Sequence, residues 1–235
     1  MLDDLCAMSL PAPEHLTIAV DDAHSVSALL LCPPNFCACY LFAHGAGAGM
    51  THPFMQAVAV DLAESGIATL RYQFPYMEQG GKRTDPPKLA HATVRAAAAE
   101  AIRRGLPLIA GGKSFGGRMT SQAQAASPLP GVRGLVFLGF PLHPANRPSD
   151  ERAKHLFDVR IPMLFLQGTR DALAQLGLVS ETTRRLGERA SLHLLHGADH
   201  SFRVPARSGR TNADVRREIK DVFLAWARSI IARGE

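Results

Sequence analysis

The sequence lacks any uninterrupted apolar run approaching the roughly 18 residues that a membrane-spanning helix requires. Its first residues, Met1-Leu2-Asp3-Asp4, are acidic and carry neither the basic segment nor the long apolar segment of a secretory signal. These two absences predict a soluble cytoplasmic protein with no membrane partner. Apolar residues make up 46% of the 235 positions and charged residues 20%, a globular composition that excludes a disordered or fibrous protein.

Cysteine is scarce too, with only Cys6, Cys32, Cys37 and Cys39 in the chain. Three of the four fall within eight positions, so a disulfide framework across the fold is not expected. The Cys-x-Cys spacing of Cys37 and Cys39 differs from the usual zinc spacings, and an apolar run follows it. Buried strand cysteines are therefore the better interpretation, and no metal ion is expected.

Positive charge is unevenly distributed along the chain. Residues 1–105 hold 7 Lys and Arg against 10 Asp and Glu, whereas residues 106–235 hold 19 against 11. A basic half can bind nucleic acid or other anions. Here the basic residues are scattered over presumed helices without an aromatic-interleaved stripe, so they indicate a solvated surface and no nucleic-acid partner.

Short apolar, β-prone runs alternate with longer helical patterns, which predicts an α/β protein. The expected strands are Leu16–Val20, Ser27–Cys32, Cys37–Ala43, Ile67–Tyr72, Pro107–Ala110, Gly134–Phe140, Met163–Gln167 and Ser191–Leu195. The expected helices are His52–Glu64, Pro87–Arg104, Gly117–Ala126, Glu151–Phe157, Leu173–Leu186 and Asn212–Ala232. No helix separates the first two strands, so they should pair antiparallel, and the later strands should form a doubly wound, mostly parallel sheet of about eight strands.

No linker and no internal repeat divides the chain, so residues 1–235 are expected to form a single domain. The loop-rich stretches Gln73–Pro86 and Pro141–Asp150 follow strand ends and are expected to edge a site. No long insertion follows Gly134–Phe140, so no large cap domain is expected and the site should be fairly open.

The sharpest local signal is Gly112-Lys113-Ser114-Phe115-Gly116, which lies between an expected strand and an expected helix. This G-x-S-x-G pattern in that context predicts a nucleophile elbow, a tight turn that exposes the Ser114 hydroxyl. The same residues include the Gly-Lys-Ser tail of a phosphate-binding loop. Pro107 stands where that loop needs its first glycine, which disfavours nucleotide binding.

A second glycine-rich segment, His44-Gly45-Ala46-Gly47-Ala48-Gly49, follows the third expected strand. It fails as a dinucleotide fingerprint because Met50 occupies the third glycine position. An oxyanion loop fits better, with His44 in a structural role and one backbone N–H group within Gly45–Gly47 serving as a donor. A flexible glycine-rich turn is the plainer alternative.

A serine nucleophile needs a base and an acidic residue that orients the base. Asp171 follows the strand Met163–Gln167 at the sheet edge expected for Ser114, whereas Asp158 precedes that strand and Asp150 lies on a distant loop. Two histidines, His196 and His200, follow the last strand. His200 comes after a Gly-Ala-Asp turn that can swing it back over the sheet edge, so it is the favoured base.

The chain resembles the α/β-hydrolases, in the dienelactone-hydrolase-like group, and is most similar to a branch of small bacterial hydrolases related to the testis-expressed and KANSL-type hydrolases. The segments that carry the resemblance are His44–Met50, His52–Met55, Gly111–Arg118, Phe165–Asp171 and Gly197–Phe202. It implies the α/β-hydrolase fold, a catalytic triad of Ser114, Asp171 and His200, and oxyanion-hole N–H groups at Phe115 and near Ala46. The chain has Ser114 where true dienelactone hydrolases carry cysteine.

These observations predict a serine hydrolase that cleaves an ester or thioester of a small soluble molecule through an acyl-enzyme, with no metal or organic cofactor. A non-catalytic interaction protein on the same fold is the alternative. Arg203, Arg207 and Arg210 follow the expected base and either meet an anionic substrate group or are plain surface residues. The sequence does not determine the oligomeric state.

Overall fold

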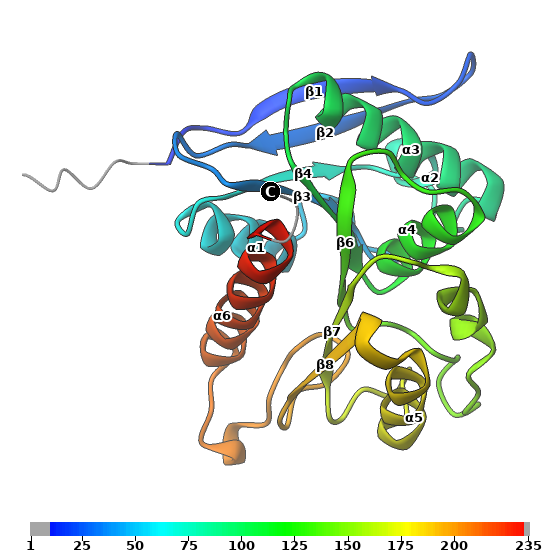
Figure 1. Ribbon diagram of the computed structural model, residues 1–235, viewed down its shortest axis with the longest axis vertical. Helices are drawn as coiled ribbons and strands as arrows, with labels where there is room; N and C mark the ends of the chain where they lie inside the picture. The colour runs from blue at the N-terminus through cyan, green and yellow to red at the C-terminus, as the bar shows by residue number, and fades with distance from the viewer. Residues whose placement is uncertain (1–9, 233–235) are drawn as a thin grey trace, which may run out of the picture.

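The computed structural model describes residues 10–232. Cys6 and the acidic residues at positions 1–4, which were considered above as a possible signal segment, lie outside this range. Its centre is an eight-stranded sheet with strand order β1-β2-β4-β3-β5-β6-β7-β8 (Figure 1). The strands are β1 (Glu14–Ala19), β2 (Ser25–Leu31), β3 (Ala38–Ala43), β4 (Ile67–Tyr72), β5 (Leu108–Lys113), β6 (Val132–Leu138), β7 (Met163–Gly168) and β8 (Ala190–Leu195). The β1–β2 and β2–β4 pairs are antiparallel, and the remaining pairs are parallel.

Helices cover both faces of the sheet, as Figure 1 shows. They are α1 (Pro53–Ala63), α2 (Pro75–Glu78), α3 (Pro87–Arg103), α4 (Phe115–Ala126), α5 (Leu176–Leu186) and α6 (Asn212–Ile231), with 3-10 turns η1 (Glu151–Asp158), η2 (Gly187–Arg189) and η3 (Ala206–Ser208). Helices α1 and α6 lie on one face and α3, α4 and α5 on the other. None of these helices is both long and apolar enough to span a bilayer.

Strand β3 shows why the central strands read as continuous apolar runs. Tyr40 and Phe42 pack into the cluster under α1 and α6, whereas Cys39 and Leu41 pack into the cluster under α3 and α4. Successive side chains of a strand point to opposite faces, so a strand covered on both sides needs apolar residues at every position. All six residues of β3 are buried.

The predicted fold class is confirmed, including the antiparallel start. Three details differ from the sequence expectations. The segment Gln73–Pro86 contains the short helix α2, whose Tyr76 is buried, as is Phe74 just before it. The expected helix at Glu151–Phe157 is the 3-10 turn η1. Cys39 is buried as predicted, but Cys37 precedes β3 and is exposed, so its prediction as a buried strand residue was wrong.

The parallel arrangement gathers six loops at one edge of the sheet. The carboxyl ends of β3, β4, β5, β6, β7 and β8 all meet there, because parallel neighbours run in the same direction. In register, Ala43 pairs with Gly112, Lys113 with Leu138 and Gly168 with Leu195. The residues that follow these strand ends therefore come from distant parts of the chain and face a common space.

The packing of α6 against the sheet predicts a test of the core. Ile219 in α6 is 1% exposed and lies in the same cluster as Phe223, whereas Ile102 in α3 is 39% exposed. Ile219→Ala should lower the free energy of unfolding by about 2–5 kcal/mol, because it removes buried methyl groups and leaves a cavity. The matched change Ile102→Ala should cost less than about 1 kcal/mol in urea unfolding. Equal losses would contradict the assigned packing of α6.

Candidate active site

The turn between β5 and α4 holds Ser114 in an unusual backbone conformation. Its φ is 50°, a value that a residue with a side chain rarely adopts. The flanking glycines allow the close approach of neighbouring strands: a Cβ on Gly112 would stand 2.3 Å from the Ala43 carbonyl oxygen, and one on Gly116 would stand 2.5 Å from the His44 carbonyl oxygen. Neither position accepts a larger residue, which is the physical reason for the spacing of the motif.

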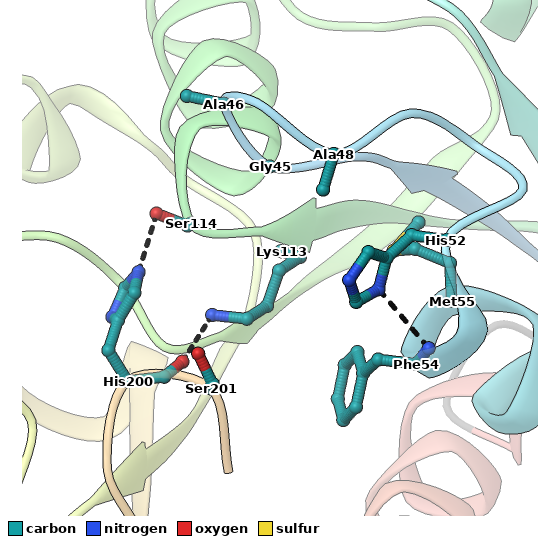
Figure 2. Close-up of a pocket in the computed structure, with 10 residues that line it drawn as sticks. All are labelled: Gly45, Ala46, Ala48, His52, Phe54, Met55, Lys113, Ser114, His200 and Ser201. Carbon is teal, nitrogen blue, oxygen red and sulfur yellow. Dashed lines mark hydrogen bonds between the residues drawn. The ribbon is translucent and has the colours of Figure 1, made fainter.

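The structure brings Ser114, His200 and Asp171 into one chain of hydrogen bonds. Ser114 Oγ lies 2.8 Å from His200 Nε2, and His200 Nδ1 lies 2.7 Å from Asp171 Oδ2. Figure 2 shows the Ser114–His200 contact across the turn. Because a carboxylate accepts hydrogen bonds, Nδ1 carries the proton in this arrangement, and Nε2 of the neutral ring is free to accept the Ser114 proton.

The Asp171 carboxylate is fully buried and well supplied with donors. Its Oδ1 accepts a hydrogen bond from Leu173 N at 2.8 Å, and its Oδ2 accepts a second from Gln167 Nε2 at 2.6 Å besides that from His200. These bonds compensate for the cost of removing a carboxylate from water. Gln167 was not singled out from the sequence, although it is a lone long polar residue within an apolar strand.

The histidine and aspartates that the sequence disfavoured lie elsewhere. His196 is exposed, and its backbone oxygen accepts a hydrogen bond from Arg210. Asp150 pairs with Arg185, and Asp158 is exposed. Asp199, beside His200, accepts hydrogen bonds from the backbone N–H groups of residues 201 and 203, so it shapes the turn that carries the histidine.

His44 anchors the glycine-rich loop after β3. It is fully buried, its Nδ1 lies 2.8 Å from the Gly45 carbonyl oxygen, and its Nε2 accepts a hydrogen bond from Phe74 N at 3.0 Å. Burial lowers the pKa of His44 to about 4. The ring is therefore neutral at pH 7, donating through Nδ1 and accepting through Nε2, which fits a structural role.

Two residues of β4 and its following loop hold the other end of this glycine-rich segment. Gln73 Oε1 accepts a hydrogen bond from Met50 N at 3.0 Å, and Arg71 donates from Nη1 to the Met50 carbonyl oxygen at 3.0 Å. Sequence reasoning missed both residues. Arg71 is a charged residue within a buried strand, which is the only signal the sequence offered.

Backbone N–H groups converge near Ser114 from two directions. Phe115 begins α4, and no side chain caps this end of the helix, so its first N–H groups face the turn. Gly45 lies against the nucleophile, since a Cβ built on it would stand 3.7 Å from Ser114 Cβ. Ala46 follows Gly45 and lines the same cavity as Ser114.

The cavity beside Ser114 has a volume of about 150 Å³. Its walls come from the loop after β3, the start of α1, the β5–α4 turn and the turn after β8 (Figure 2). The lining residues are Gly45, Ala46, Ala48, His52, Phe54, Met55, Lys113, Ser114, His200 and Ser201.

Neither Gln73–Pro86 nor Pro141–Asp150 contributes to this cavity, so the expectation that these loops line it was wrong. The first is folded around the buried Phe74 and Tyr76, and the second is held by His143, which accepts a hydrogen bond from Gln175 N.

An open hollow of about 430 Å³ adjoins this cavity and shares His52, Phe54 and Ser201 with it. Arg203 lines the hollow with its side chain exposed, and the half-buried Arg216, which pairs with Asp61, lines it too. The other two arginines considered from the sequence do not line it. Arg207 is exposed on η3, and Arg210 pairs with Glu218.

A second serine–histidine contact joins α4 to η1. Ser121 Oγ lies 2.8 Å from His155 Nε2 and 3.0 Å from the Arg118 carbonyl oxygen. Burial, reinforced by the charge of Arg118, lowers the pKa of His155 to about 4. Ser121 is completely buried. Across residues 10–232, no three His, Cys, Asp or Glu side chains are grouped in a way that could hold a metal ion.

Solved structures share this fold over nearly the whole chain. A dienelactone hydrolase from Anabaena variabilis is 20% identical, with a TM-score of 0.72 over 92% of this chain and 99% of its own. An esterase domain from Rhodothermus marinus is 19% identical, with a TM-score of 0.73 over 94% and 100%. A serine hydrolase without a lid from Xanthomonas campestris is 20% identical, with a TM-score of 0.70 over 92% and 95%. Residues 36–228 match the family described as the alpha/beta hydrolase domain, and the chain belongs to that family.

Proposed function

We propose that this chain is a single-domain serine hydrolase that cleaves a carboxylic ester or thioester of a small molecule through an acyl-enzyme. The observation that carries the proposal is the hydrogen-bond chain from Ser114 through His200 to the buried Asp171, at the mouth of a cavity. The family membership and the shared fold with esterases support it. Ser114 is the nucleophile, His200 the base and Asp171 the residue that orients the base.

The Ser121–His155 contact supports a catalytic role less well. Ser121 is completely buried and lines neither of the two hollows near α1, whereas Ser114 borders the cavity directly. Within residues 10–232 no carboxylate hydrogen-bonds to His155, so this ring lacks the orienting partner that Asp171 gives His200. The pair is better explained as a hydrogen bond that fastens η1 to α4.

The proposed reaction begins when Ser114 Oγ attacks the carbonyl carbon and passes its proton to His200 Nε2. Asp171 stabilises the resulting imidazolium through Nδ1. The N–H groups of Phe115 and Ala46 donate to the oxyanion, and such donors each lower the barrier by about 2.7–4 kcal/mol. His200 then gives the proton to the leaving alcohol or thiol, and a water molecule activated by His200 releases the acid from Ser114.

The substrate class follows from the size and walls of the cavity. A volume of about 150 Å³ suits a small acyl group, and Phe54, Met55 and Ala48 offer it apolar contacts. The adjoining open hollow leaves room for a leaving group that extends toward solvent. The resemblance to the dienelactone-hydrolase-like group, and to the testis-expressed and KANSL-type branch within it, is consistent with this class. The serine at position 114 favours an ester or thioester over dienelactone itself.

The nucleophile can be tested with a matched pair of serines. Ser114→Ala should abolish covalent labelling by a fluorophosphonate probe and lower the turnover of model esters by several orders of magnitude, because the triad acts as a unit. Ser121→Ala should retain labelling, since Ser121 is assigned a structural hydrogen bond. Mass spectrometry of the labelled peptide identifies the site. A wild type that takes no label would support the non-catalytic alternative, and a label on Ser121 would reverse the assignment.

The orienting carboxylate can be tested by a change of one atom. Asp171→Asn should reduce kcat by roughly 10⁴, the loss seen in the best-known triad, because an amide at this position favours the wrong imidazole tautomer. Asp158→Asn, on an exposed aspartate, is the matched control and should leave kcat unchanged. A small loss in Asp171→Asn would mean that His200 is oriented by other contacts.

The arginine that lines the open hollow predicts a charge preference. Arg203→Ala should raise KM for anionic esters more than for neutral esters of equal size, and added salt should weaken the difference, because exposed charges are screened. Arg207→Ala should change neither KM, since Arg207 does not line the hollow. Equal effects of Arg203→Ala on both ester classes would make Arg203 a plain surface residue.

A further inference from the structure

Lys113, the residue before the proposed nucleophile, has a position that the proposed reaction does not explain. Its Nζ donates a hydrogen bond to the backbone oxygen of His200 at 2.6 Å and lies 5.0 Å from the centre of the Phe202 ring. Figure 2 shows the side chain running from the β5–α4 turn to the turn that carries the base. A single ammonium group therefore links the elbow to two residues of the His200 loop.

The same ammonium group lies beside the Asp171–His200 pair. A Cβ built on Gly139, at the end of β6, would stand 3.2 Å from Lys113 Nζ and 3.5 Å from both Asp171 Oδ2 and His200 Nδ1. The titratable groups that face Lys113 are Asp171, after β7, and Asp199 and His200, after β8. The ammonium is thus close enough to act on the charge of the pair, while its hydrogen bond goes to a neutral carbonyl.

We infer that Lys113 is a positioning residue of the hydrolase, which clamps the His200 loop onto the elbow and biases the His200 imidazole toward its neutral, proton-accepting form. The inference rests on the proposed function, because it assigns Lys113 a role toward that base. The clamp fixes the distance between Ser114 Oγ and His200 Nε2. The positive charge of Lys113 offsets part of the electrostatic effect of Asp171 on His200. It thereby disfavours the imidazolium before the substrate arrives.

The surroundings of Lys113 make its ammonium group easier to deprotonate than that of a lysine in water. Burial lowers the pKa of Lys113 to about 8, although Asp171 and Asp199 act in the opposite direction. The folded protein therefore binds this proton less readily than the unfolded chain, whose lysines titrate near 10.5. The ammonium destabilises the fold below about pH 8, and this penalty disappears as the pH rises to 10.5. A lysine whose charge stabilised the fold would have a raised pKa and the opposite dependence of stability on pH.

The test compares Lys113→Met, which removes the donor and the charge, with Lys113→Gln, which keeps a donor but no charge. Lys88→Met, on an exposed lysine of α3, is the matched control. The readout is the rate at which a fluorophosphonate labels Ser114 between pH 5 and pH 10, so no natural substrate is needed. Thermal unfolding of each variant is followed over the same range of pH.

Lys113→Met should label about 10- to 100-fold more slowly at pH 7, because the base is no longer held against Ser114. The rise of the rate on the acid side should move to higher pH, because the positive charge of Lys113 no longer opposes the imidazolium. Lys113→Gln should share the shift and keep more of the rate at pH 7.

The stability measurement distinguishes a lysine that positions His200 from a lysine that only stabilises the fold. Lys113→Met should melt at the same temperature as wild type or higher at pH 7, and any gain should shrink above pH 8. A wild-type pH profile in Lys113→Met would overturn the inference, as would an equal loss of rate at every pH together with a lower melting temperature. A wild type that takes no label overturns the proposed function itself, and the inference with it. If wild type is labelled and the Lys113 variants are labelled at the same rate with the same pH profile, the inference alone is overturned.

Discussion

The site depends on the close approach of β5 to its neighbours at the point where the chain turns into α4. Gly112 and Gly116 lie so near the carbonyl oxygens of Ala43 and His44 that no side chain fits at either position. The turn can then be tight enough to hold Ser114 at a φ of 50°, with its Oγ toward His200 and the start of α4 behind it. A relaxed turn would direct this side chain elsewhere, and the loops from β3, β7 and β8 would no longer surround the Ser114 hydroxyl.

Buried polar groups then orient the remaining side chains. Asp171 accepts hydrogen bonds from Gln167, Leu173 and His200, and this set of donors holds its carboxyl group in place beside the imidazole. On the opposite side of Ser114, His44 is neutral because it is buried, and it fixes the glycine-rich loop through one donor and one acceptor. Two histidines near the same serine thus have different roles because their partners differ: a carboxylate for one, and a carbonyl and an amide for the other.

Most of the fold was accessible from the sequence, because strands buried on both faces must be apolar throughout and because glycine positions report backbone constraints. The strand ends also located Ser114, Asp171 and His200, since parallel strands deliver their carboxyl ends to one edge. The roles of Gln167 and Lys113 were not accessible in this way. Spacing places a residue along a strand, but the atom that a long side chain reaches depends on packing around it. The error about Gln73–Pro86 has a related cause, since its glycines and prolines suggested a loop whereas Phe74 and Tyr76 are core residues.

Several features of the site are individually unfavourable to folding: a non-glycine residue at positive φ, a buried carboxylate, and a lysine whose pKa is lowered by burial. They persist because the packing of the surrounding structure allows these residues no other conformation. The elbow is fixed between β3, β6 and α4, and the Asp171 turn follows a strand with all six residues buried. The clusters under α1 and α6 and under α3 and α4 supply the stability that such strain requires. Helices far from Ser114 therefore help to hold it in place, because a less stable sheet would let the turn, and the lysine beside it, relax into less strained conformations.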